Sequence, residues 1–214
     1  MTFFHRHERK QSRFTDDVSL ENQTNNEEHK GILKNLSDQQ LWLEFLNGSD
    51  SAFAQIYSRF FSLLFNYGIK IDSNRQLIND CIQDLFIDIW NSRSRLSEVE
   101  WLKTYLIKSL RRRILKESNK ESFLYSGSIN EDYDFQVVLS HDMQLIREED
   151  IVLQNDRLKQ ALSELTYRQR EAIFLKFYER LTYEQIADVM AITVKATYKI
   201  MARAIEVLKK AFLK

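Results

Sequence analysis

The chain has 214 residues, no proline, four glycines and one cysteine. A fold rich in tight turns or phosphate-binding loops would need more glycine and proline, and a lone cysteine excludes an internal disulfide and a multi-cysteine metal site. No apolar run approaches the roughly 20 residues needed to span a bilayer, and the charged start lacks a signal-peptide core. We therefore expect an all-α, cytoplasmic protein. Its formal net charge is zero, whereas proteins that hold DNA unaided usually carry a positive excess.

Residues 1–36 are polar and aperiodic, which predicts a disordered leader. From Ser37 onward, apolar residues recur at helical spacing, and several helix starts carry the capping-box pattern of Ser or Thr followed three residues later by Gln or Glu. The pairs are Ser37–Gln40, Ser73–Gln76, Ser97–Glu100, Thr166–Gln169 and Thr182–Gln185. Together the patterns predict helices over residues 38–47, 50–70, 74–91, 98–119, 150–164, 167–179, 183–190 and 194–212.

The helix predicted over residues 74–91 has one apolar side and one acidic side. We call the polar side the acidic face, and its residues are Asp80, Gln83, Asp84 and Asp88. Such a face is typical of a helix that is simply solvated, and composition alone favours this interpretation.

The next predicted helix, residues 98–119, is aromatic at its start and basic towards its end. Its candidates for contact with unpaired bases and phosphates are Trp101, Tyr105, Lys108, Arg111 and Arg112. The alternative is a surface helix whose long side chains reach out to water. The three consecutive arginines cannot all point the same way on a helix, so at least one of them is structural or solvated.

Residues 121–148 break the helical periodicity, contain Ser126-Gly127-Ser128 and carry several acidic residues with few basic partners. This composition predicts a flexible linker. The chain then divides into an N-terminal helical domain over residues 37–120 and a C-terminal one over residues 149–214.

Within the C-terminal domain, residues 181–208 predict a helix, a tight turn and a second helix. The second helix places one apolar stripe inward, with Val194, Thr197, Met201, Ala204 and Leu208. Its other side, which we call the recognition face, carries Lys195, Tyr198, Lys199 and Arg203, and Tyr183 lies at the start of the first helix. A short helix that is apolar behind and basic in front fits the major groove of DNA.

Two sets of motifs resemble a known family. The pattern Asp80-x-x-Gln83-Asp84-x-Phe86-x-x-x-Trp90, followed by Trp101-Leu102 and a basic helix, is similar to conserved region 2 of bacterial sigma-70-type initiation factors. Leu165-Thr166-x-x-Gln169-Arg170 and Leu181-Thr182-Tyr183-Glu184-Gln185-Ile186-Ala187, followed by the turn and the second helix, resemble region 4. The two-domain layout resembles the extracytoplasmic-function (ECF) subgroup.

The resemblance implies a factor that is not an enzyme and needs no catalytic residue, metal, cofactor or small-molecule substrate. It implies that the acidic face docks on the clamp helices of the largest subunit of core RNA polymerase, with a further contact to the flap. The loop over residues 91–97 and the basic helix would bind unpaired bases of the −10 promoter element. The recognition face and Tyr183 would read the −35 element. An anti-sigma protein, often membrane-bound in this family, is a further implied partner.

The chain departs from the family pattern at four positions. Thr166 stands where proline is typical, Arg180 where glycine is frequent, and Ile200 where many relatives have an arginine that faces DNA. Ala191 replaces the usual turn glycine, which costs free energy if this residue needs a positive φ. We therefore expect the helix-turn-helix to form and its base preference to differ from that of familiar promoters.

Two other functions fit parts of the pattern. One is an autonomous helix-turn-helix regulator whose N-terminal domain senses a ligand or dimerises. The other is an enzyme that uses the carboxylates between residues 80 and 88, but the Glu-x-x-His pairs of helical di-metal sites are missing and all four histidines lie in the leader or the linker.

Overall fold

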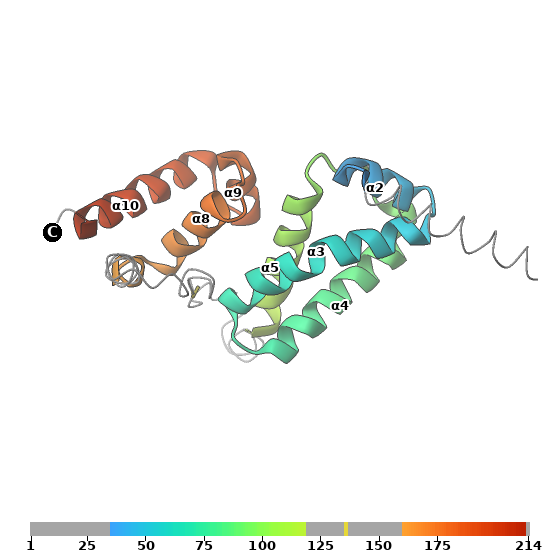
Figure 1. The fold of residues 1–214 in the computed structure, drawn as a ribbon, viewed down its shortest axis with the longest axis horizontal. Coiled ribbons are helices and arrows are strands. Elements are labelled where there is room, and N and C mark those ends of the chain that lie inside the picture. Colours follow the sequence, from blue (N-terminus) through green and yellow to red (C-terminus); the bar gives the residue numbers. More distant parts are fainter. Residues whose placement is uncertain (1–34, 119–134, 137–159, 213–214) are drawn as a thin grey trace, which may run out of the picture. The chain divides into compact units, whose positions relative to one another are not determined.

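The computed structural model describes residues 35–118, 135–136 and 160–212, and every regular element in these ranges is a helix (Figure 1). The elements are α2 (Asp38–Leu46), α3 (Asp50–Ile71), α4 (Arg75–Ser92), the 3-10 turn η1 (Arg93–Arg95), α5 (Leu102–Ser118), α8 (Tyr167–Phe177), α9 (Tyr183–Val189) and α10 (Val194–Phe212). The predicted all-α class is confirmed. Nearly all of the predicted leader and linker, and most of the helix predicted over residues 150–164, lie outside the described residues. Among the described helices, none combines the length and apolarity that crossing a membrane requires.

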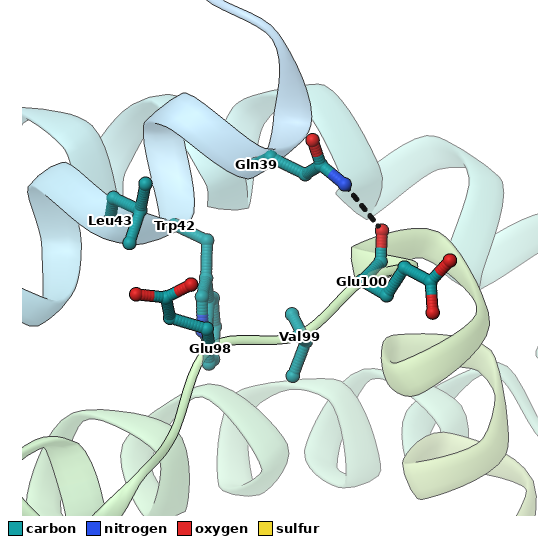
Figure 2. A pocket seen from close by; sticks show the side chains of 6 residues that line it. All are labelled: Gln39, Trp42, Leu43, Glu98, Val99 and Glu100. Atoms are coloured by element: carbon teal, nitrogen blue, oxygen red, sulfur yellow. Dashed lines mark hydrogen bonds between the residues drawn. The ribbon is translucent and has the colours of Figure 1, made fainter.

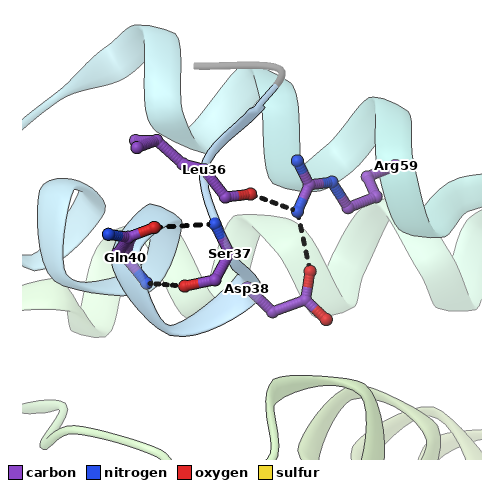
Figure 3. A network of polar contacts seen from close by, with 5 residues as sticks. All are labelled: Leu36, Ser37, Asp38, Gln40 and Arg59. Atoms are coloured by element: carbon purple, nitrogen blue, oxygen red, sulfur yellow. Dashed lines mark hydrogen bonds and ion pairs between the residues drawn. The ribbon is translucent and has the colours of Figure 1, made fainter. Parts of the chain in front are cut away.

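Three of the predicted capping boxes are confirmed, at Ser37, Thr166 and Thr182. Figure 3 shows the first: the Ser37 backbone N–H donates to Gln40 Oε1 at 2.9 Å, and the Gln40 N–H donates to Ser37 Oγ at 3.2 Å. Arg59 of α3 reinforces this helix start, because its Nη1 donates to the Leu36 carbonyl at 2.9 Å and pairs with Asp38 at 2.8 Å. The start of α2 is therefore held both locally and by a neighbouring helix.

The other two predicted capping boxes are wrong. At α4 the cap is Asn74 and not Ser73, because Asn74 Oδ1 accepts from the backbone N–H groups of Gln76 and Leu77 at 3.1 and 3.2 Å. After η1 the chain stays irregular until Leu102, so Ser97 lies in a loop. The Ser97 carbonyl accepts a hydrogen bond from Trp42 Nε1 at 3.0 Å, which shows that a tertiary contact holds this segment away from the helix that local spacing favoured.

The contacts divide the described chain into two compact units. The first contains residues up to Arg59 together with Arg93–Glu100. Its core includes Trp42 and Phe45 of α2, whose ring centroids lie 5.2 Å apart, and the partly exposed Phe53 of α3 lies against Phe45, with centroids 5.3 Å apart. Gly48 follows α2 with a φ of +104°, a conformation that side-chain-bearing residues rarely adopt.

The second unit contains Phe60–Ser92 and the chain from Trp101 on. Its α4 and α5 pack through apolar stripes at three- and four-residue spacing, which are buried and comprise Ile78, Ile82, Leu85, Phe86, Ile89, Leu102, Leu106, Leu110 and Ile114. A Cβ atom on Gly68 of α3 would lie 2.7 Å from Cγ2 of Ile78. The absence of a side chain at this position therefore lets α3 and α4 approach closely.

The predicted helix-turn-helix is confirmed as α9, a short turn and α10. The turn is a Schellman motif: Ile192 N–H donates to the Ala187 carbonyl at 3.0 Å and Ala191 N–H donates to that of Asp188 at 3.3 Å. Ala191 has a φ of +54°, and Arg180, in the turn before α9, has a φ of +57°. Both positions where the sequence lacks the family's glycine therefore do require the left-handed conformation.

Candidate protein and nucleic-acid interfaces

The acidic face of α4 is exposed, and it lies opposite the buried stripe of the same helix. The side chains of Asp84 and Asp88 are 61% and 64% exposed, and Gln76 Nε2 donates to Asp80 at 3.0 Å. Arg113 of α5 forms ion pairs with both Asp84, at 3.5 Å, and Asp88. The four predicted residues are thus brought together on one surface, and the structure adds a cation that sequence spacing did not associate with them.

Exposed apolar side chains adjoin the acidic face. Ile87 is 55% exposed and Trp90 is 38% exposed. Trp90 was named from the sequence only as part of the region 2 motif, and Ile87, which follows the buried Phe86 and precedes Asp88, was not singled out. The helical spacing places both Ile87 and Trp90 on the outer side of α4, so their exposure could have been predicted from the sequence.

The loop between η1 and α5 borders an open cavity of about 370 Å³ (Figure 2). The cavity is lined by Gln39, Trp42 and Leu43 of α2 and by Glu98, Val99 and Glu100 of the loop. The loop is tied to α2 by the Trp42–Ser97 hydrogen bond and by Gln39 Nε2, which donates to the Glu100 carbonyl at 3.0 Å. Sequence reasoning placed a base-binding loop at residues 91–97 and missed the α2 wall, because nothing in local spacing links residues 39 and 100.

The residues predicted to contact unpaired bases and phosphates occupy very different surroundings. Trp101 is 44% exposed and Arg112 is exposed, whereas Arg111 is only 5% exposed. Tyr105 is half-buried, and this burial raises the pKa of its hydroxyl against the smaller opposite effect of a hydrogen bond from Ser109. The expectation that Arg111, Arg112 and Arg113 cannot point the same way agrees with this arrangement.

Arg111 belongs to a buried polar cluster with Glu171 of α8 and Tyr67 of α3. Arg111 Nε donates to Glu171 Oε1 at 2.9 Å, and the Tyr67 hydroxyl donates to the same oxygen at 2.6 Å. Glu171 is fully buried, and burial of a carboxylate is tolerated only with such charged and hydrogen-bonding partners. No sequence pattern indicated this role, since an isolated glutamate on a helix usually lies in water.

Two further cations of α5 pair with carboxylates later in the chain. Lys108 Nζ lies 2.6 Å from Asp188 Oδ1 of α9, and Lys103 Nζ lies 2.6 Å from Glu179 Oε2. Lys108 and Asp188 are each about half exposed, so this pair can exchange with other ions. Lys108 therefore remains available to a phosphate, whereas Arg111 is enclosed.

The recognition face of α10 is fully formed. Lys195, Tyr198, Lys199 and Arg203 are all exposed, and Thr197, Met201 and Ala204 are buried behind them. Val194 was predicted to lie inward and is instead 37% exposed, because it is the first residue of the helix and has no preceding turn to pack on.

Tyr183 lies against the recognition helix. Its ring stacks on that of Tyr198 with centroids 4.3 Å apart, and Lys176 Nζ lies 4.9 Å from the Tyr183 centroid. The partly buried ring agrees with packing against the second helix. The stack also holds the exposed Tyr198 ring in place at the middle of the recognition face.

Comparison with known proteins bears on both the helix-turn-helix and the whole fold. Residues 155–208 match the family model described as Sigma-70, region 4. The fold is similar to that of CnrH, solved in complex with the cytosolic domain of CnrY, with a TM-score of 0.53 at 17% identity over 82% of this chain and 96% of that one. It is also similar to that of the sigma factor RpoE, solved with the anti-sigma factor NepR from Bartonella quintana, with a TM-score of 0.51 at 21% identity over 75% of this chain and 96% of that one. The search of curated proteins finds no match.

The resemblance that the motifs indicated is thereby confirmed for the segment that carries the helix-turn-helix, and the fold is similar to those of CnrH and of the sigma factor RpoE.

Proposed function

We propose that this chain is a sigma-70-type transcription initiation factor of the ECF subgroup, which binds core RNA polymerase, recognises the −35 and −10 promoter elements and helps to open the DNA. One observation carries the proposal. The segment that matches Sigma-70 region 4 exposes Lys195, Tyr198, Lys199 and Arg203 on one side of α10 and buries the opposite side. That is the geometry with which a recognition helix enters the major groove.

The acidic face of α4 is the proposed docking surface for the clamp helices of polymerase. Its carboxylates are exposed, and exposed apolar side chains lie beside them. Neighbouring exposed apolar side chains rimmed by polar residues are typical of protein-binding surfaces.

The loop before α5 is one proposed contact for the −10 element, and the outer side of α5, taken by itself, is another. The cavity volume lies within the range of ligand-binding sites, and its exposed carboxylates can accept hydrogen bonds from the amino groups of an unstacked base. Trp101, just before α5, is exposed and supplies a stacking surface, and Lys108 and Arg112 on α5 are exposed and supply cations. Because Arg111 is enclosed with Glu171, we assign it a role in holding the fold.

Opening of the promoter then requires no catalytic residue. Base pairs lost from the duplex are replaced by stacking and hydrogen bonds of single bases on the protein, and cations of α5 neutralise the phosphates. The net charge of the chain is zero. This fits a factor that binds DNA jointly with polymerase and does not bind it tightly by itself. Because CnrH and RpoE were each solved with a bound protein, and NepR is an anti-sigma factor, we also propose that an anti-sigma protein binds this chain.

Run-off transcription with purified core polymerase on genomic fragments tests the proposal. We expect promoter-specific transcripts only when the chain is present, and co-purification of the chain with core polymerase. Replacement of Asp84 by lysine should abolish both without unfolding the protein, since the Asp84 side chain is 61% exposed. Transcripts that do not depend on the chain would refute the proposal.

An autonomous regulator would behave differently in one respect. It would bind a specific duplex tightly without polymerase, in a gel-shift assay with the purified chain. Tight specific binding in that assay, together with no co-purification of polymerase, would favour this second function.

A further inference from the structure

Ile87 is the most exposed apolar side chain of α4, at 55%. Residues three, four and seven positions apart lie on the same side of a helix, so Asp80, Gln83 and Asp84 precede Ile87 on its side and Trp90 follows it. The buried stripe of α4 lies on the other side. Ile87 therefore contributes little to the core of the protein and is surrounded by the polar residues of the acidic face.

The charges around Ile87 are ordered. Arg113 lies on α5 and holds Asp84 and Asp88 through its two terminal nitrogens, while both carboxylates keep more than half of their side-chain surface in water. An arginine that bridges two carboxylates fixes their rotamers, which reduces the conformational entropy that a partner would otherwise remove on binding. Three aspartates against one arginine still leave the surface negative.

We propose that Ile87 is the apolar anchor of the polymerase-docking surface and that Arg113 is a positioning residue for its carboxylates. The partner segment on polymerase must then present an apolar side chain flanked by lysine or arginine. The flanking residues of the partner must be basic because they face three aspartates. An apolar centre inside a polar rim is the usual arrangement of binding hot spots. The inference rests on the proposed function and adds to it the chemistry of the contact.

Binding of the full-length chain to core polymerase, measured by fluorescence anisotropy at about 0.1 M and about 0.5 M salt, tests the anchor. We expect Ile87→Ala to weaken binding by about thirtyfold, as for a hot spot, and by a similar factor at both salt concentrations. Asp84→Asn should weaken binding at low salt and much less at high salt, because salt screens exposed charges. Phe177→Ala on α8, which removes another exposed apolar side chain (61%), should leave binding unchanged.

Thermal melting shows whether a loss of binding arises from unfolding of the variant. Since Ile87 is mostly exposed, its alanine variant should melt at the temperature of the wild type. An Ile87→Ala chain that melts normally and binds core polymerase with unchanged affinity would refute the anchor while leaving the proposed function intact. A wild-type chain that fails to bind polymerase would refute the proposed function itself, and the inference with it.

Arg113 has its own matched pair of variants. We expect Arg113→Gln to weaken binding about threefold and Arg113→Lys to restore part of the loss. Lys116→Gln removes the same charge from an exposed position of the same helix and should have no effect. Tighter binding by Arg113→Gln would show that Arg113 competes with the partner's cations, and would refute its positioning role.

Discussion

Helices α5 and α10 are both rich in lysine and arginine, and both were predicted from the sequence to contact DNA. The surroundings of their cations differ in the structure. On α10, Lys195, Lys199 and Arg203 are exposed to solvent. On α5, four cations lie within ion-pair distance of carboxylates: Lys103, Lys108, Arg111 and Arg113. A row of basic residues therefore predicts a nucleic-acid surface only where the fold leaves its cations in water, as on α10, or in an exposed ion pair such as that of Lys108 with Asp188.

The strongest test of this comparison concerns Arg111. Its removal leaves the fully buried Glu171 without its cation, and breaking a buried pair in this way costs about 3–5 kcal/mol. We expect Arg111→Ala to lower the free energy of unfolding by about that amount in urea denaturation. Arg203→Ala on α10 should change it by less than about 0.5 kcal/mol. Equal stability of the two variants would show that the buried pair contributes no more than a surface charge.

Cys81 provides a second measurement on the α4–α5 half of the molecule. Burial raises the pKa of this thiol to about 11, with Glu117 adding to the effect. Each pKa unit is a factor of ten in thiolate population, so at pH 8 we expect alkylation about a hundredfold slower than for an exposed thiol, with a rate that rises as the pH approaches 11. Iodoacetamide labelling followed by mass spectrometry measures this rate.

The same thiol also distinguishes the effects of substitutions on α5 from those on α10. Arg111→Ala should accelerate labelling of Cys81 by destabilising the unit that buries it, whereas Arg203→Ala should not. Rapid labelling of the folded wild type would contradict the buried environment of α4.

On α10 the expected effects are on DNA and not on stability. Lys199→Ala or Arg203→Ala should weaken binding of the polymerase complex to a promoter duplex by about 1–3 kcal/mol if the side chain contacts a base edge. A contact to phosphate should instead reduce the slope of log affinity against log salt by about one unit. Titration of labelled duplex at several salt concentrations separates the two roles. No change in either quantity would remove that residue from the recognition face.

The smallest expected effect concerns the turn between these two helices. Ala191 has a φ of +54°, which costs an L-residue about 1–2 kcal/mol, while glycine also increases the entropy of the unfolded chain. We expect Ala191→Gly to stabilise the chain by about 0.5–1 kcal/mol in urea denaturation. The same substitution at Ala202, an exposed position inside α10, should destabilise it by about 1 kcal/mol. Effects of the same sign would contradict the left-handed turn.

Much of the fold could be predicted because its signals are local. The capping boxes at Ser37, Thr166 and Thr182 form between residues three apart, and the exposed residues of α10 follow helical spacing. The same logic failed at Ser97, where the hydrogen bond from Trp42 joins residues 55 positions apart. It also overlooked Asn74, whose side chain reaches the same backbone donors that Ser73 was expected to bind.

Periodicity and caps a few residues long were enough to predict the helical class, the helix-turn-helix and the polar residues of α4 and α10 that face outward. Periodicity misplaced Val194, and which charges are neutralised depends on contacts between helices. Glu171 and Arg113 show no distinctive pattern in the chain. Glu171 pairs with Arg111, which was predicted to contact DNA, and Arg113 pairs with two aspartates of the acidic face. Electrostatic partners are chosen by distance in space, and distance between helices is set by how their apolar sides pack.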